Sequence, residues 1–167
     1  MKRIYLDHAA ATPLDKRVKE AMEPFWSEIF ANPGNEHKDG LLAKEHLEKS
    51  RETISQILGV RREEIFFTSG GTESNSLALI GFLNYLEDKG KLDGSHIITS
   101  VIEHPSVLDI FKKYKKKGLG VDFVPVTGDG LINMRELEQM INEDTVLVSI
   151  VYVNSEIGTV QPLKEIS

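Results

Sequence analysis

Three short stretches of the chain place glycines and polar side chains directly after apolar segments. The first, residues 68–75, reads Thr-Ser-Gly-Gly-Thr-Glu-Ser-Asn and leads into a helical pattern. Glycine lets a backbone approach a ligand closely, and the free N–H groups and positive dipole end of a helix attract anions. Gly71 and Thr72 therefore predict a phosphate site, although a tight turn with a helix cap explains the stretch equally well. It is neither a Walker A loop nor a G-x-G-x-x-G fingerprint.

The second stretch, residues 101–106, reads Val-Ile-Glu-His-Pro-Ser. It places His104 between the end of a predicted strand and a helix that begins with proline. An imidazole in this position can stack on a planar ligand, or act as an acid or base near neutral pH. For a single histidine, however, capping the helix or packing in the loop is the more frequent role.

The third stretch, residues 152–159, reads Tyr-Val-Asn-Ser-Glu-Ile-Gly-Thr and follows a nearly continuous apolar run. Asn154 and Ser155 can hydrogen-bond a phenol or carbonyl oxygen of a ligand. An Asx or Ser turn is the commoner outcome for this stretch alone. Taken together, the three stretches offer a phosphate cradle, an aromatic ring and amide or hydroxyl groups. This combination matches a planar, phosphorylated aromatic cofactor.

The elements that must position these residues alternate along the chain. The sequence predicts strands at residues 65–68, 96–101, 121–126 and 146–153. It predicts helices from the Asp15 cap to about Phe30 with a break at Pro24, at residues 41–58, 72–88 and 105–117, from Asn133 or Met134 to about Asn142, and from Pro162 onward. Such alternation predicts an α/β fold, with a mostly parallel sheet and helices on both faces. Ligands bind at the carboxyl ends of strands in such sheets, where we expect the three stretches to meet.

Composition narrows the function further. The 167 residues contain 20 Lys+Arg and 26 Asp+Glu, a net charge of −6, which argues against a nucleic-acid-binding module and a polybasic membrane anchor. The basic run at residues 112–117 then reads as a solvated helix face. The absence of cysteine excludes disulfides, Cys–zinc sites and thiol nucleophiles from these residues, and we expect no metal site. Neither a secretory signal nor a membrane-spanning segment is predicted, so we expect a cytoplasmic protein.

Five stretches, in order and spacing, resemble the N-terminal portion of cysteine desulfurases of the NifS/IscS type. These are fold-type I enzymes of the class V aminotransferase family, which use pyridoxal 5′-phosphate (PLP). The matching stretches are residues 5–13, Asn32-Pro33 with His37, and residues 67–75, 103–108 and 153–162. The resemblance implies that residues 1–14 form an N-terminal arm belonging to the small domain. It also implies that residues 15–167 form the first part of the PLP-binding large domain.

The resemblance also implies roles for individual residues. Gly71 and Thr72 would hold the PLP phosphate through backbone N–H groups and a hydroxyl. His104 would stack on the pyridine ring and shuttle a proton, which makes it the catalytic residue of this portion. The family usually carries a second asparagine where this chain has Ser155, and that asparagine donates to the phenolic oxygen of PLP. With the shorter serine, a bridging water or Asn154 is the substitute.

The activity implied is conversion of L-cysteine to L-alanine by a homodimer. The sulfur would pass as a persulfide to acceptors such as an iron–sulfur scaffold protein, or toward tRNA thiolation. The family's cofactor-attachment lysine, its aspartate at the pyridine nitrogen and its persulfide cysteine are expected beyond residue 167, so these residues alone should be inactive. The alternatives are another class V enzyme, such as an aminotransferase or selenocysteine lyase, a non-catalytic phosphate-binding or scaffold protein from a truncated gene, or part of a split enzyme.

Overall fold

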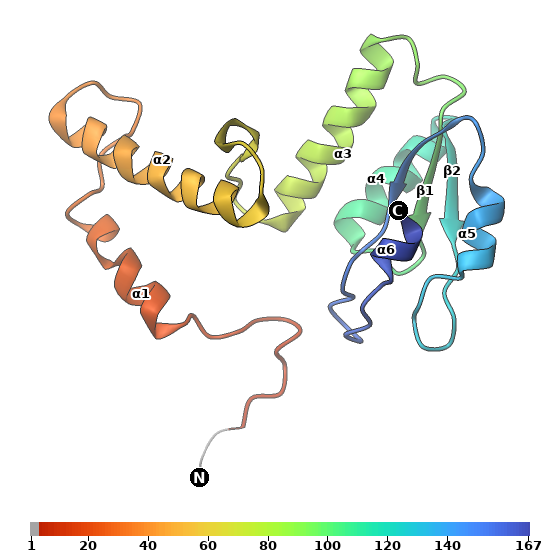
Figure 1. The fold of residues 1–167 in the computed structure, drawn as a ribbon, viewed down its shortest axis with the longest axis horizontal. Coiled ribbons are helices and arrows are strands. Elements are labelled where there is room, and N and C mark those ends of the chain that lie inside the picture. The colour runs from red at the N-terminus through yellow and green to blue at the C-terminus, as the bar shows by residue number, and fades with distance from the viewer. Residues whose placement is uncertain (1–3) are drawn as a thin grey trace. The chain divides into compact units, whose positions relative to one another are not determined.

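The computed structural model describes residues 4–167, and the chain divides into two compact units, Met1–Phe67 and Thr68–Ser167. Residues 1–3 of the expected arm lie outside the described residues, and the arm itself stays a prediction. Figure 1 labels the helices and strands along the chain. In the part that the structure describes, no helix is both long and apolar enough to cross a membrane.

The first unit is helical. It contains α1 (Lys16–Met22), the 3₁₀ helix η1 (Glu23–Trp26), α2 (Lys38–Leu58) and the 3₁₀ helix η2 (Arg62–Glu64). Asp15 caps α1, as expected, by accepting a hydrogen bond of 2.8 Å from the backbone N–H of Arg17. The α-helix ends at Met22 rather than near Phe30, because Pro24 lacks the N–H that would continue it and the chain tightens into η1.

The helix α2 follows its predicted course. It begins at Lys38, three residues before the predicted first residue, and His37 caps this end. Gly59 ends the helix with a φ of 67°, in the left-handed region that favours glycine. The predicted strand at residues 65–68 is wrong, because no strand forms there. Phe66 and Phe67 are exposed, and the Ile65 carbonyl accepts from the Arg51 side chain instead of from a neighbouring strand. β-branched and aromatic content alone therefore does not make a strand without a partner.

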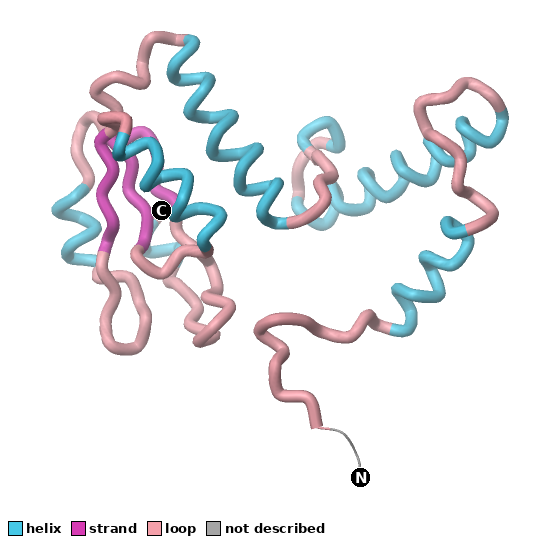
Figure 2. Tube along the Cα trace, turned by 180° about the vertical axis from the view of Figure 1, so that it is seen from behind, coloured by secondary structure: helices cyan, strands magenta, loops and turns pink. Residues whose placement is uncertain are grey.

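The second unit is the α/β part of the molecule. It contains α3 (Gly71–Asp88), β1 (His96–Ser100), α4 (Pro105–Lys116), β2 (Gly120–Val124), α5 (Met134–Met140), β3 (Thr145–Ser149) and α6 (Leu163–Ile166). The three strands form a parallel sheet in the order β2-β1-β3, visible in magenta in Figure 2. Ile97 of β1 pairs with Val121 on one side and with Leu147 on the other. A helix lies between each pair of successive strands in the chain, as parallel pairing requires.

Helices cover both faces of this sheet, as predicted. Ile97 packs with Leu83 of α3 and Phe111 of α4, whereas Ile98 packs on the opposite face with Leu137 of α5 and Ile166 of α6. Successive residues of a strand point to opposite faces, so the central strand β1 supplies both cores. All five of its residues are buried.

The strand β3 is shorter and more open than the apolar run at residues 146–153 predicts. It ends at Ser149, where its pairing with Thr99 of β1 also ends. It lies at the edge of the sheet, and Val146 keeps 40% of its surface exposed. The chain then turns back on itself, with an antiparallel bridge between Val153 and Val160. This turn carries the third polar stretch.

Candidate functional site

The three polar stretches lie in the second unit, at the N-terminus of α3, at the β1–α4 junction and after β3. Two of them follow strand ends, as expected, whereas the first follows a segment that is not a strand. Direct hydrogen bonds join α3 to the second stretch and the second stretch to the third. The carboxyl ends of the strands therefore bring together the second and third stretches. The packing of α3 against α4 positions the first stretch.

The N-terminus of α3 forms an open anion cradle. Gly70 precedes the 18-residue helix in an extended conformation, and the backbone N–H groups of Gly71 and Thr72 donate to no acceptor among residues 4–167. A Cβ atom added to Gly70 or Gly71 would meet nothing within 4 Å. Free donors, an unobstructed approach and the helix dipole together suit a phosphate group. The exposed Thr72 adds a hydroxyl.

Side chains of the same stretch hold the turn in shape. Glu73 accepts hydrogen bonds of 2.6 Å from both the hydroxyl and the backbone N–H of Ser69. These bonds hold the pKa of the Glu73 carboxyl below its usual value, the hydroxyl contributing most. The hydroxyls of Thr68 and Ser74 lie 2.6 Å apart and close the turn from the other side. The cradle is thus fixed by its own residues, without using the N–H groups of Gly71 and Thr72.

His104 caps α4. Its Nδ1 accepts from the backbone N–H of Ser106 at 3.1 Å and lies 2.7 Å from the Ser106 hydroxyl. That hydroxyl also accepts a 2.9 Å hydrogen bond from the side-chain amide of Asn75 on α3. The capping role weighed for this histidine is therefore real. It leaves the imidazole exposed, so capping and ligand contact are compatible.

Asn154 organises the turn after β3. Its Oδ1 accepts from the backbone N–H groups of Glu156 and Ile157, at 2.9 and 3.1 Å, which is an Asx turn. Its Nδ2 donates to the Ile102 carbonyl at 3.0 Å and so ties this turn to the β1–α4 loop. Ser155 beside it is exposed, and its hydroxyl has no hydrogen-bond partner in the described part of the chain. Of the two, Ser155 is the residue left free for a ligand.

Glu103 is a buried carboxyl that the sequence reasoning missed. It keeps 7% of its surface exposed, and its Oε1 accepts from the Ser100 hydroxyl at 2.7 Å and from the Val151 backbone N–H at 2.6 Å. Burial raises the pKa of Glu103, against the opposing effect of these two hydrogen bonds. The carboxyl of Glu103, the residue before His104, thus links the end of β1 to the segment that follows β3. A charged residue two positions after the predicted strand 96–101, next to His104, was the signal available.

Gln161 is a second buried polar residue that the sequence reasoning missed, with only 1% of its surface exposed. Its Oε1 accepts from the Ile132 N–H at 2.9 Å, and its Nε2 donates to the Gly130 carbonyl at 2.7 Å. These bonds fasten the loop before α5 to the turn that carries Asn154 and Ser155. No local pattern marks Gln161, because both partners lie about thirty residues earlier in the chain.

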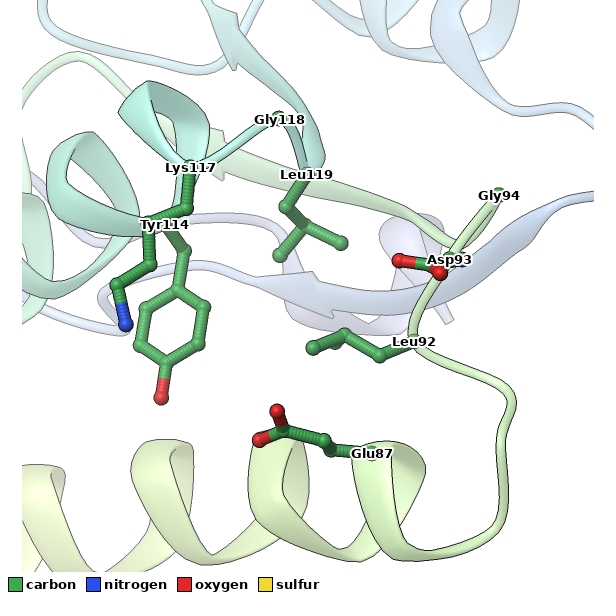
Figure 3. A pocket seen from close by; sticks show the side chains of 8 residues that line it. All are labelled: Glu87, Leu92, Asp93, Gly94, Tyr114, Lys117, Gly118 and Leu119. Carbon is green, nitrogen blue, oxygen red and sulfur yellow. The ribbon is translucent and has the colours of Figure 1, made fainter.

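A pocket with a volume of about 300 Å³ lies elsewhere in this unit (Figure 3). It is formed by the last turns of α3 and α4 and by the loops leading into β1 and β2, including Glu87, Tyr114 and Lys117. This is the amino end of the strands, opposite the predicted site residues. Between residues 4 and 167, no group of three or more His, Asp or Glu side chains is arranged to hold a metal ion.

Comparison with known proteins gives a consistent result. The family model "Aminotransferase class-V" matches residues 4–167. Cysteine desulfurase IscS of Dictyoglomus turgidum is 44% identical over 168 residues, which cover 100% of this chain and 42% of that protein. Cysteine desulfurase IscS 1 of Archaeoglobus fulgidus is 45% identical over 163 residues, which cover 98% of this chain and 42% of that protein.

Solved structures agree. A NifS-like protein superposes with a TM-score of 0.91 at 41% identity, over 99% of this chain and 44% of the other. SspA in complex with cysteine superposes with a TM-score of 0.86 at 38% identity, over 97% of this chain and 46% of the other. The chain thus spans less than half the length of the relatives that it matches.

Proposed function

Because the chain belongs to the aminotransferase class-V family, we propose that it is the N-terminal part of a PLP-dependent cysteine desulfurase. The observation that carries the proposal is the open cradle at Gly71 and Thr72, joined through Asn75 to the His104 cap. A phosphate site and an exposed aromatic ring on adjoining helices suit a phosphorylated aromatic cofactor. Identity of 44–45% to proteins named cysteine desulfurase supports the substrate.

The residues present fit PLP. The backbone N–H groups of Gly71 and Thr72 and the Thr72 hydroxyl would hold the phosphate dianion. His104 would lay its exposed ring against the pyridine ring. Ser155 would hydrogen-bond the phenolic oxygen, directly or through water, because Asn154 is already engaged by the loop. When bound, PLP supplies the electron sink that weakens bonds at the substrate's α-carbon and β-carbon.

This chain's own contribution is binding and proton handling. The cradle would hold the phosphate end, and the His104 ring would lie against the pyridine ring. The second nitrogen of the imidazole, Nε2, is available to exchange a proton with substrate. We place the cofactor-attachment lysine and the sulfur-accepting cysteine in the remainder of the complete protein. On this proposal, the 167 residues alone do not turn over substrate.

The substrate we propose is L-cysteine, converted to L-alanine with transfer of the sulfur as a persulfide. SspA, one of the structural relatives, was solved in complex with cysteine. The acceptor would be a protein that assembles iron–sulfur clusters, and the complete enzyme would act as a homodimer in the cytoplasm. An aminotransferase or a selenocysteine lyase uses the same cradle and is distinguished by its products.

The test is formation of alanine from L-cysteine by the complete protein loaded with PLP, with a dithiol reductant added to release the persulfide sulfur as sulfide, together with titration of PLP binding by absorbance. Thr72→Val keeps the side-chain shape and removes the hydroxyl, so we expect PLP to bind about 10- to 100-fold more weakly. Thr53→Val, on the exposed surface of α2, is the matched control and should leave binding unchanged. Equal affinity in the wild type and Thr72→Val would contradict the cradle. Amino transfer to an added keto acid, without sulfide, would contradict the desulfurase.

A further inference from the structure

We propose that Ser106 and Asn75 are positioning residues, which hold the His104 ring in one orientation and keep its proton on Nε2. The inference deepens the proposed function and rests on it for its catalytic meaning. The hydrogen-bonding argument itself stands on the geometry of α3 and α4. It assigns a task to two side chains that are not among the residues proposed to bind PLP and that do not line the pocket of Figure 3.

The geometry is a chain of three side chains. The Asn75 amide nitrogen lies 2.9 Å from the Ser106 hydroxyl, which lies 2.7 Å from His104 Nδ1. Asn75 comes from α3, whereas Ser106 and His104 belong to the start of α4. These hydrogen bonds therefore bridge two helices that pack together. Asn75 and Ser106 are partly buried, which shields these bonds from competing water.

The direction of each hydrogen bond follows from the groups involved. An amide nitrogen only donates, so the Ser106 hydroxyl accepts from Asn75. Because His104 Nδ1 already accepts from the Ser106 backbone N–H, the hydroxyl must donate its own hydrogen to Nδ1. The Ser106 backbone N–H also donates to Nδ1, at 3.1 Å. Two donors face this nitrogen, so it must present its lone pair. A neutral imidazole then carries its single proton on Nε2.

The opposite tautomer is disfavoured by the same contacts. A proton on Nδ1 would face the Ser106 N–H across 3.1 Å, and helix α4 would lose its cap. Pro105, between the two residues, has no N–H of its own, so the Ser106 amide is the first backbone donor that α4 offers. The sequence His-Pro-Ser thus builds a cap with a defined proton position.

The arrangement has a consequence for the proposed reaction. His104 has no acceptor for Nε2 among the residues that the structure describes, so Nε2–H is the group left to meet cofactor or substrate. Asn75 lies one helical turn after Gly71, so the residues that cradle phosphate and those that orient the ring share one rigid helix. Ring orientation and phosphate position are thereby set together.

The experiment measures the tautomer directly. The complete protein, free of PLP and labelled with ¹⁵N in histidine, is examined by long-range ¹H–¹⁵N correlation at a pH where the ring is neutral. The His104 signals are identified by their loss in His104→Gln. We expect the Nε2–H form in the wild type and in Ser106→Thr, which retains the hydroxyl. In Ser106→Ala the tautomer ratio should shift toward Nδ1–H by about 2- to 12-fold.

Asn75→Asp gives a sharper test. A carboxylate is nearly the same shape but only accepts, so the Ser106 hydroxyl turns its hydrogen toward residue 75 and its lone pair toward His104. The Nδ1–H population should rise at least as much as in Ser106→Ala, with no loss of packing. Ser50→Ala, which removes an exposed hydroxyl on α2, is the control and should leave the His104 signals unchanged.

The outcomes separate this inference from the proposed function. An unchanged His104 tautomer in both Ser106→Ala and Asn75→Asp overturns the positioning role, even if PLP binds to every variant. Tautomer shifts in the expected order support it, even if PLP fails to bind the wild type, a result that would instead refute the proposed function. With PLP bound, a shifted pH profile of alanine formation in Asn75→Asp, restored toward the wild type in Asn75→Gln, supports the catalytic meaning.

Discussion

At the scale of single residues, buried polar groups decide how the functional loops are held. Glu103 uses one carboxyl oxygen to hold both Ser100, at the end of β1, and the backbone of Val151, beyond the end of β3. His104 is the next residue in the chain. The loop that carries its ring is therefore held by a buried carboxyl that is not among the residues proposed to contact the cofactor.

The raised pKa of Glu103 predicts a pH dependence of stability. In the folded protein the pKa of this carboxyl lies above its ordinary value of 4.5, so between that value and the raised folded pKa the native state binds more protons than the unfolded chain. The free energy of unfolding should therefore fall as pH rises through this window. Glu103→Gln cannot titrate, so its stability should lack this contribution.

The measurement is urea-induced unfolding of the wild type and Glu103→Gln at a series of pH values. The difference between the two isolates Glu103 from carboxyls such as Glu73, whose lowered pKa acts in the opposite direction. A difference that does not vary with pH, or one in which the wild type gains stability as pH rises, would contradict the assignment.

At the scale of elements, the helices were predictable because their start and stop signals are local. The cap at Asp15, the glycine stop at Gly59 and the proline start at Pro105 each act within one turn. The strands were less predictable, because a strand exists only where a distant segment pairs with it. This is why residues 65–68 form no strand and why β3 stops at Ser149, where its pairing ends.

The same reasoning applies to the site. Gly71, Thr72 and His104 stand at helix starts, and local patterns place residues at such positions reliably. The contacts that join them do not show in the sequence, because Asn75 meets Ser106 across 31 positions and Glu103 meets Val151 across 48. The Asn154 contact with Ile102 spans 52 positions, so the local sequence predicts the turn at Asn154 but not its link to the second stretch.

The N-terminus of α2 gives a prediction at this scale. A Cβ atom on Gly40 would lie 2.5 Å from the Asn35 carbonyl oxygen and 3.0 Å from that of Asn32, so Gly40→Ala must displace the preceding loop. We expect a loss of about 1 to 3 kcal/mol in the free energy of unfolding. Urea denaturation of the complete protein measures it.

Gly34→Ala is the matched control. Its added Cβ meets only the exposed side chain of Asn32, at 3.2 Å, and no backbone atom, so stability should change by no more than about 0.5 kcal/mol. Equal effects of the two substitutions would show that the close approach at Gly40 does not constrain the loop.

At the scale of the whole molecule, β2 and β3 are edge strands, each paired only with β1 in this sheet. On the β3 side, Val146 is 40%, Val153 46% and Tyr152 59% exposed. Apolar side chains beside unpaired backbone groups invite association with other chains. We therefore expect the isolated 167-residue chain to self-associate, and to lack the sharp two-state melt of a monomer.

Sedimentation over a range of concentrations measures this association. Val146→Lys puts a charge at the β3 edge and should reduce it, whereas Val18→Lys, at an exposed position of α1, should not. A concentration-independent monomer with a sharp thermal transition would count against the prediction, as would equal effects of the two lysines.

The central position of β1 also sets an order of assembly. Its partner β2 is the nearer in sequence and is connected through α4, whereas β3 must close a loop about twice as long. Because longer loops form more slowly, we expect β1, α4 and β2 to fold before β3 docks. In pulse-labelled hydrogen exchange during refolding, the amides of β2 should gain protection before those of β3. Asn154 and Ser155 would then reach their places last, so a nascent chain would form the cradle at Gly71 and Thr72 and position His104 before it completes the proposed cofactor site.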